Sequence, residues 1–96
     1  MTGLHTLVWL ITNLLELKIY PNPSSNVFNL SFVSKNTQNL KIRVINIVGE
    51  IIYTEQLDRF IGEYLKRVDF SNNAKGIYFL IAETNNGVIN KKLILQ

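Results

Sequence analysis

Residues 76–95, "GIYFLIAETNNGVINKKLIL", decide the fold, because they are typical of two strands joined by a tight turn. The runs Ile77–Thr84 and Val88–Leu95 are rich in β-branched and aromatic residues, and turn residues separate them. Asn86-Gly87 is a favoured central pair for a two-residue type I′ turn. This turn predicts a hairpin in which Leu80 lies opposite Leu93, Phe79 opposite Ile94 and Tyr78 opposite Leu95.

The first strand of this hairpin is apolar at every position from Ile77 to Ala82. A strand with one solvated face alternates between apolar and polar residues, whereas a strand that is buried on both faces does not. The sequence therefore predicts a central strand that is covered on both sides.

Upstream, short runs with alternating polarity recur between turn signals, as in β-sandwiches. Phe28, Leu30 and Phe32 are expected on one face of a strand, with polar residues between them. The same alternation places Leu40, Ile42 and Val44, and then Tyr64, Val68 and Phe70, on buried faces. The predicted fold is an all-β, seven-stranded, antiparallel Ig-like sandwich, of Greek-key type. Its strands are Leu17–Tyr20, Val27–Val33, Leu40–Ile47, Ile51–Leu57, Tyr64–Phe70, Ile77–Thr84 and Val88–Leu95.

A second turn is indicated at Asn46-Ile47-Val48-Gly49. Asparagine is favoured at the first position of a type I turn, and a glycine at the end can take the left-handed conformation of a G1 bulge. The turn predicts a hairpin that pairs Val44 with Ile52 and Ile45 with Ile51.

The sequence enters this β-rich region through Tyr20-Pro21-Asn22-Pro23. Proline fixes its own φ, has no N–H, and keeps the preceding residue out of the helical region. The tetrapeptide is therefore expected to be a stiff, non-helical corner that marks the start of the folded domain.

The first sixteen residues, "MTGLHTLVWLITNLLE", differ from the rest of the chain. Their apolar residues have helical spacing, so residues 1–16 are expected to be a separate leader that is either a short helix or a remnant of an upstream segment. The run is too short to span a membrane. It also lacks the basic start and the small-residue cleavage site of a secretory signal peptide. Residues 17–96 are expected to form the β-domain.

Composition excludes most kinds of chemistry. The chain has 96 residues, no cysteine and one histidine, His5, which lies in the leader. Disulfides, thiolate metal sites and Cys/His nucleophile systems therefore lack their parts. The acidic residues are scattered, with no calcium-loop spacing, and the glycines are isolated, with no phosphate-binding loop. The net charge of +3 is spread along the chain, whereas a nucleic-acid binder usually gathers it on one face. The sequence predicts a non-catalytic domain without cofactor or metal, transmembrane segment or nucleic-acid partner.

Four elements, in their order along the chain, resemble the C-terminal sorting domain of the type IX (Por) secretion system. They are a Y-P-N-P corner, an N-x-x-G hairpin, a G-I-Y strand that leads into a last hairpin, and a basic and hydrophobic terminus. The resemblance covers residues 17–96. The residues that carry it are Tyr20, Pro21, Asn22, Pro23, Asn46, Gly49, Gly76, Ile77, Tyr78, Asn86, Gly87, Lys91, Lys92, Leu93, Ile94, Leu95 and Gln96.

The resemblance implies a sorting signal. In this family an upstream cargo domain of the same polypeptide is exported to the periplasm of a Gram-negative bacterium. The outer-membrane translocon then recognises the C-terminal domain, and a sortase-like cysteine protease usually removes it as the cargo reaches the cell surface or the medium. Residues Lys91–Gln96 are then the candidates for recognition, with the two lysines steering and the apolar residues making contact. The same apolar residues are also expected to close the core against Tyr78–Leu80.

Two points remain open at this level. The sorting domain should follow a cargo domain and a polar linker, and residues 1–16 match neither. The alternative function is an Ig-like or fibronectin-like spacer or adhesion module at the cell surface, which would not need a specific C-terminus.

Overall fold

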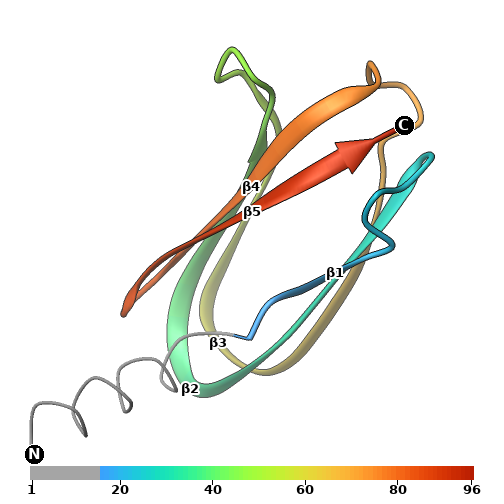
Figure 1. Ribbon diagram of the computed structural model, residues 1–96. Helices are drawn as coiled ribbons and strands as arrows, with labels where there is room; N and C mark the ends of the chain where they lie inside the picture. Colours follow the sequence, from blue (N-terminus) through green and yellow to red (C-terminus); the bar gives the residue numbers. More distant parts are fainter. Residues whose placement is uncertain (1–15) are drawn as a thin grey trace, which may run out of the picture.

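The computed structural model describes residues 16–96, and these residues form five antiparallel strands in one curled sheet (Figure 1). The predicted leader, including His5, lies outside the described residues except for Glu16. The strands are β1 (Lys18–Tyr20), β2 (Val27–Ile45), β3 (Ile51–Asp69), β4 (Gly76–Thr84) and β5 (Gly87–Leu95).

The all-β, antiparallel prediction is confirmed, but a sandwich of seven separate strands is not found. The two predicted strands Val27–Val33 and Leu40–Ile47 are joined in one 19-residue strand, β2, which ends at Ile45 and not at Ile47. Ile51–Leu57 and Tyr64–Phe70 are likewise joined in β3, which ends at Asp69. The polar segments between them do not form connecting loops. Pairing resumes across a bend: Ser34 lies opposite Gly62 and Gln38 opposite Phe60, and residues 35–37 fall in the irregularity between these two pairs.

The bend has identifiable causes. The β2–β3 register shifts between Ser34 and Gln38, and Arg59 and Gly62 on β3 have φ angles of 53° and 105°. Such irregularities bend and twist a strand pair sharply. The buried Gln38 side chain donates a hydrogen bond to the Ser34 hydroxyl at 2.9 Å, so polar groups inside the bend are satisfied.

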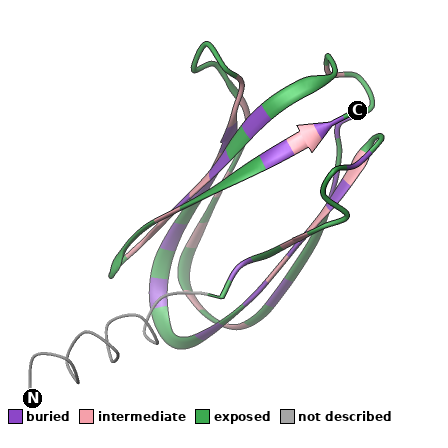
Figure 2. Ribbon diagram, viewed as in Figure 1, coloured by how far each residue is buried: buried purple, intermediate pink, exposed green. Residues whose placement is uncertain are grey.

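Because β2 and β3 bend together, the sheet has two halves that face each other (Figure 1), and the buried residues of both halves form one core cluster. In one half, β1 and β3 flank the start of β2, and in the other half β3 and β4 flank its end, with β5 beside β4. Figure 2 shows that buried and exposed residues alternate along the strands, as the sequence predicted. The core contains Leu17, Phe28, Leu30, Phe32, Leu40, Ile42, Val44, Tyr64, Val68, Phe70, Tyr78, Leu80, Ala82, Leu93 and Leu95.

The β2–β3 turn forms at the predicted residues. The Gly49 N–H donates to the Asn46 carbonyl at 3.0 Å, and Gly49 has a φ of 90°. Ile45 lies opposite Ile51, as predicted, but Val44 lies opposite Tyr53 and not Ile52. The predicted second pair is wrong because Ile52 is an additional residue on β3, which makes a bulge.

The β4–β5 hairpin also forms, but its register differs from the prediction by two residues. Asn85 and Asn86 are the central residues of the turn, and Thr84 pairs with Gly87. The Thr84 hydroxyl accepts a hydrogen bond from the Asn86 N–H and donates one to the Gly87 carbonyl, both at 3.0 Å, which stabilises this turn. The observed pairs are Tyr78 with Leu93, Phe79 with Lys92 and Leu80 with Lys91.

Strand β4 has neighbours on both edges, as expected of a central strand, but the prediction that both its faces are covered is wrong. Ile77 and Phe79 remain 42% and 37% exposed, whereas Tyr78 and Leu80 are buried. The curled sheet has only one inner face, and no other described element packs on its outer face.

Candidate functional site: the clasped terminal strand

The candidate site is the last strand, β5. It contains five of the six predicted recognition residues, Lys91–Leu95, and the sixth, Gln96, follows it directly. Leu93 and Leu95 point into the core and are 0% and 2% exposed. Ile94 is half-buried, and Lys91, Lys92 and Gln96 are exposed. Alternate residues of a strand point to opposite faces, so the apolar residues of this segment divide between core and outer surface.

The Y-P-N-P corner lies directly against this strand, although about seventy residues separate them. The Asn22 side-chain amide donates a hydrogen bond to the Lys92 carbonyl at 2.8 Å and accepts one from the Ile94 N–H at 3.0 Å. One side-chain amide therefore bonds to the strand edge as a backbone peptide group of a neighbouring strand would.

Ser24 continues this contact with its backbone. Its N–H donates to the Ile94 carbonyl and its carbonyl accepts from the Gln96 N–H, both at 2.9 Å. Ser24 and Leu95 form a parallel bridge. We call this group of residues, Asn22, Ser24, Lys92, Ile94 and Gln96, the clasp.

The sequence around Asn22 places its side chain for this contact. Tyr20 ends β1 opposite Asn29, whose side chain donates to the Tyr20 carbonyl at 3.1 Å. Pro21 and Pro23 follow on either side of Asn22, both after cis peptide bonds. Neither proline has an N–H, so the donors that this corner offers to β5 are the Asn22 side chain and the Ser24 backbone.

The Gly76-Ile77-Tyr78 element lies on the other edge of the terminal strand. Gly76 pairs with Leu95 and Tyr78 with Leu93. The Tyr78 ring packs edge-on against Phe70 at 5.7 Å, and its hydroxyl donates to the Ala74 carbonyl. The end of β5 is thus held between β4 on one edge and the clasp on the other.

The two hairpin turns do not join this site. The Asn46–Gly49 turn projects beyond the sheet at the end of β2, and the Asn86-Gly87 turn lies at the opposite end of β5 from the clasp (Figure 1). Their role in the described fold is to reverse the chain.

The outer face beside the site is partly apolar. Ile77 and Phe79 of β4 are exposed there, and they lie opposite Ile94 and Lys92 respectively. Apolar residues and a lysine therefore share one surface near the end of the terminal strand.

Part of the outer edge of β5 is also free of partners among residues 16–96. The Ile94 N–H and carbonyl point away from β4 into the clasp, and the β4–β5 register has no irregularity from Gly87 to Leu95. Alternate residues of an antiparallel strand direct both backbone groups to the same side, so Val88, Asn90 and Lys92 also direct theirs away from β4. Within residues 16–96, β5 pairs with no strand other than β4.

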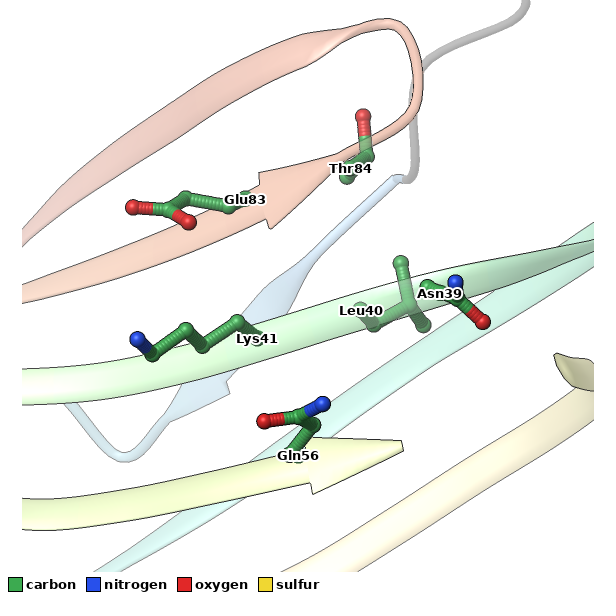
Figure 3. Close-up of a pocket in the computed structure, with 6 residues that line it drawn as sticks. All are labelled: Asn39, Leu40, Lys41, Gln56, Glu83 and Thr84. Atoms are coloured by element: carbon green, nitrogen blue, oxygen red, sulfur yellow. The ribbon is translucent and has the colours of Figure 1, made fainter. Parts of the chain in front are cut away.

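A shallow hollow of about 220 Å³ lies elsewhere, between β2, β3 and β4 (Figure 3). Its one acidic residue, Glu83, forms an ion pair with Arg43 at 2.6 Å. The hydroxyl of Thr84, another lining residue, bonds within the hairpin turn to the Asn86 N–H and the Gly87 carbonyl. It is lined by Asn39, Leu40, Lys41, Gln56, Glu83 and Thr84.

One polar cluster was not anticipated from the sequence. The Tyr53 hydroxyl donates to the Glu55 carboxylate at 2.8 Å, and the Tyr64 hydroxyl donates to the same oxygen. Burial, with the hydrogen bond to Glu55, raises the pKa of Tyr53 to about 12 and raises the pKa of Tyr64 further. Both phenols therefore stay protonated at neutral pH.

Two further features of the described residues bear on function. No group of three or more histidine, cysteine, aspartate or glutamate side chains in residues 16–96 is placed to hold a metal ion. A helix long and apolar enough to cross a membrane does not occur in this part of the chain.

Sequence reasoning selected Asn22 and Lys91–Gln96 separately, and missed both their contact and the part that Ser24 takes in it. The only local signal was an asparagine between two prolines, which says nothing of a partner seventy residues away. The hydrogen bonds from Asn22 and Ser24 show that the corner also closes the sheet onto its last strand.

Comparison with known proteins identifies the family. No curated protein matches the chain. A family model described as "Secretion system C-terminal sorting domain" matches residues 18–96, from the first residue of β1 to the last residue of the clasp. The chain therefore belongs to the type IX secretion system C-terminal sorting domain family.

Proposed function

We propose that this domain is a non-catalytic signal that directs an attached cargo protein across the outer membrane through the type IX translocon. The cargo would be an upstream domain of the same polypeptide, exported first to the periplasm of a Gram-negative bacterium. A sortase-like cysteine protease would act on the domain as the cargo reaches the cell surface or the medium. The six residues Lys91–Gln96 are the proposed recognition segment.

The observation that carries this proposal is the family match over residues 18–96. The geometry supports it, because the recognition segment belongs to a folded strand whose two edges are held by β4 and by the clasp. Lys91 and Lys92 are exposed on that strand and can steer an acidic receptor surface toward it.

The proposal is tested with the whole chain fused behind an export signal and a fluorescent cargo, in a bacterium that has the type IX machinery. Delivery is measured as fluorescence at the cell surface and in the medium. The double substitution Lys91→Glu with Lys92→Glu is compared with Lys66→Glu with Arg67→Glu. The control pair is also adjacent, basic and exposed, but lies on β3, and it changes the net charge equally.

We expect delivery of the unmodified fusion and of the control pair, and retention of the Lys91/Lys92 variant in the periplasm. Retention of the unmodified, folded fusion would refute the sorting function. A second fusion carries the domain between two cargo domains. A sorting signal read at its C-terminal strand should fail there, whereas the spacer or adhesion module should be unaffected.

A further inference from the structure

The β5 edge that faces away from β4 has two parts, one bonded to Asn22 and Ser24 and one not bonded to them. From Lys92 to Gln96 the backbone groups at this edge are bonded to Asn22 and Ser24. From Val88 to the Lys92 N–H the pattern of the strand continues, but neither Asn22 nor Ser24 bonds to this part of the edge.

We infer that the free edge of β5, formed by the outward N–H and carbonyl groups of Val88 and Asn90 and the N–H of Lys92, takes an added strand from the receptor. This inference rests on the proposed sorting function and assigns the receptor-facing surface of the same strand.

The clasp shows that this edge accepts another chain segment. Ser24 pairs with Leu95 as a parallel strand would, and the Asn22 amide reproduces one further peptide group of that pairing. An extended partner placed along Val88–Lys92 would continue the same ladder toward Gly87. Strand addition of this kind obtains its affinity from backbone hydrogen bonds and its specificity from alternate side chains.

The side chains along this edge indicate the chemistry of the partner. Val88 is 57% exposed and Ile89 is half-buried, whereas Lys91 and Lys92 are exposed one on each face of the strand. The complementary segment is therefore an extended polypeptide with apolar side chains beside Val88 and Ile89 and acidic side chains beside the two lysines. On the neighbouring strand, Ile77 and Phe79 are exposed opposite Ile94 and Lys92, at the other end of the hairpin from Val88.

Two side chains of the recognition segment, Leu93 and Leu95, do not face a receptor in the folded domain. Leu93 and Leu95 lie in the core, so contact with their side chains would require the strand to leave the sheet. The free edge at Val88–Lys92 is accessible while the domain stays folded.

The test is Asn90→Pro in the full fusion described above. Proline removes the N–H that points away from β4 and blocks a neighbouring strand, and it is tolerated at sheet edges whose N–H faces solvent. The matched control is Ile47→Pro, at the second position of an exposed turn, where proline is favoured. Thermal unfolding of each fusion's sorting domain establishes that it is folded.

We expect the Asn90→Pro fusion to fold and to lose delivery, with its cargo held in the periplasm, while the Ile47→Pro fusion is delivered. Delivery of a folded Asn90→Pro fusion at the unmodified level would overturn the inference and leave the sorting function intact. Failure of the unmodified fusion would instead refute the sorting function itself.

Val88→Pro provides the second variant should Asn90→Pro unfold. Amide hydrogen exchange on the unmodified chain is independent of both substitutions. Detergent-solubilised outer membranes from cells with the translocon should slow exchange at Val88, Asn90 and Lys92, and membranes from cells without it should not. No slowing with either preparation would overturn the inference.

Discussion

The side chain of Asn22 bonds to the backbone of Ile94, accepting its N–H at 3.0 Å, across 72 positions of the sequence. The same side chain donates to the Lys92 carbonyl. A motif near the start of the domain therefore holds the strand that carries the proposed recognition segment, and the strength of this contact can be measured.

Asn22→Ala should lower the free energy of unfolding by about 1 kcal/mol, because it removes two hydrogen bonds. A single hydrogen bond contributes about 0.5–1.5 kcal/mol to stability, and these two are exposed to solvent. Hydrogen exchange at the Ile94 amide should become faster than in the unmodified protein. Chemical denaturation and amide exchange measure the two effects. Asn72→Ala, at an exposed asparagine outside the clasp, is the control, and an equal effect there would contradict a specific role for Asn22.

Leu93→Ala and Leu95→Ala should each lower the free energy of unfolding by about 2–5 kcal/mol, the usual cost of a cavity at a buried leucine. Both side chains are almost completely buried. Leu65→Ala makes the same chemical change at a leucine that is 70% exposed and should cost much less. Similar losses at all three positions, measured by denaturant unfolding, would show that the terminal strand is not part of the core.

Gly49→Ala should destabilise the domain by about 1–2 kcal/mol, the usual cost of a left-handed conformation for a residue with a Cβ. The cause is the backbone alone, because Gly49 has a φ of 90° and an added Cβ would meet no atom within 4 Å. Gly49→Asn should cost less, since asparagine tolerates this region better. A gain in stability for Gly49→Ala in thermal unfolding would mean that the turn adopts another conformation.

Stability should fall as the pH rises above about 10, partly because of Tyr53. An unfolded tyrosine loses its proton near pH 10, whereas in the folded domain burial and the hydrogen bond to Glu55 raise the pKa of Tyr53 to about 12. The folded state therefore retains a proton that the unfolded state has lost, and its stability declines between these two values as the pH increases.

Tyr53→Phe removes this group and should make the decline between pH 10 and pH 12 less steep. Urea unfolding at a series of pH values, with phenolate absorbance as a second readout, measures the difference in slope. Identical slopes for the two proteins would contradict the raised pKa of Tyr53.

The interior of the fold was predictable because each strand obeys a local rule. The alternation in residues 28–32 and 40–44 requires only that one face of a strand be buried. The structure buries the apolar residues of both segments, Phe28, Leu30, Phe32, Leu40, Ile42 and Val44. The Asn46–Gly49 turn was predictable for a similar reason, since side-chain and backbone preferences of four adjacent residues determine it.

Register and continuity were less predictable. Ile52 forms a bulge, and Thr84 stabilises a turn centred on Asn85-Asn86, so pairs inferred from ideal turns were displaced. The displacement in β5 is of two residues, which leaves Leu93 and Leu95 on the predicted face because side chains alternate with a period of two. The segments that join the halves of β2 and β3 have the composition of loops, yet the pairing of these two strands resumes across the bend.

The sequence by itself determined the all-β class, the buried faces of the alternating strands, the Asn46–Gly49 turn and the order of motifs that identifies the family, because all of these depend on neighbouring residues. Only the tertiary structure decided that two long strands carry the sheet through its bend and that β4 has an open outer face. It also decided that Asn22 and Ser24 occupy one part of the last strand's edge and leave another part without a partner among residues 16–96. These features depend on contacts between residues far apart in the chain, which no local pattern encodes.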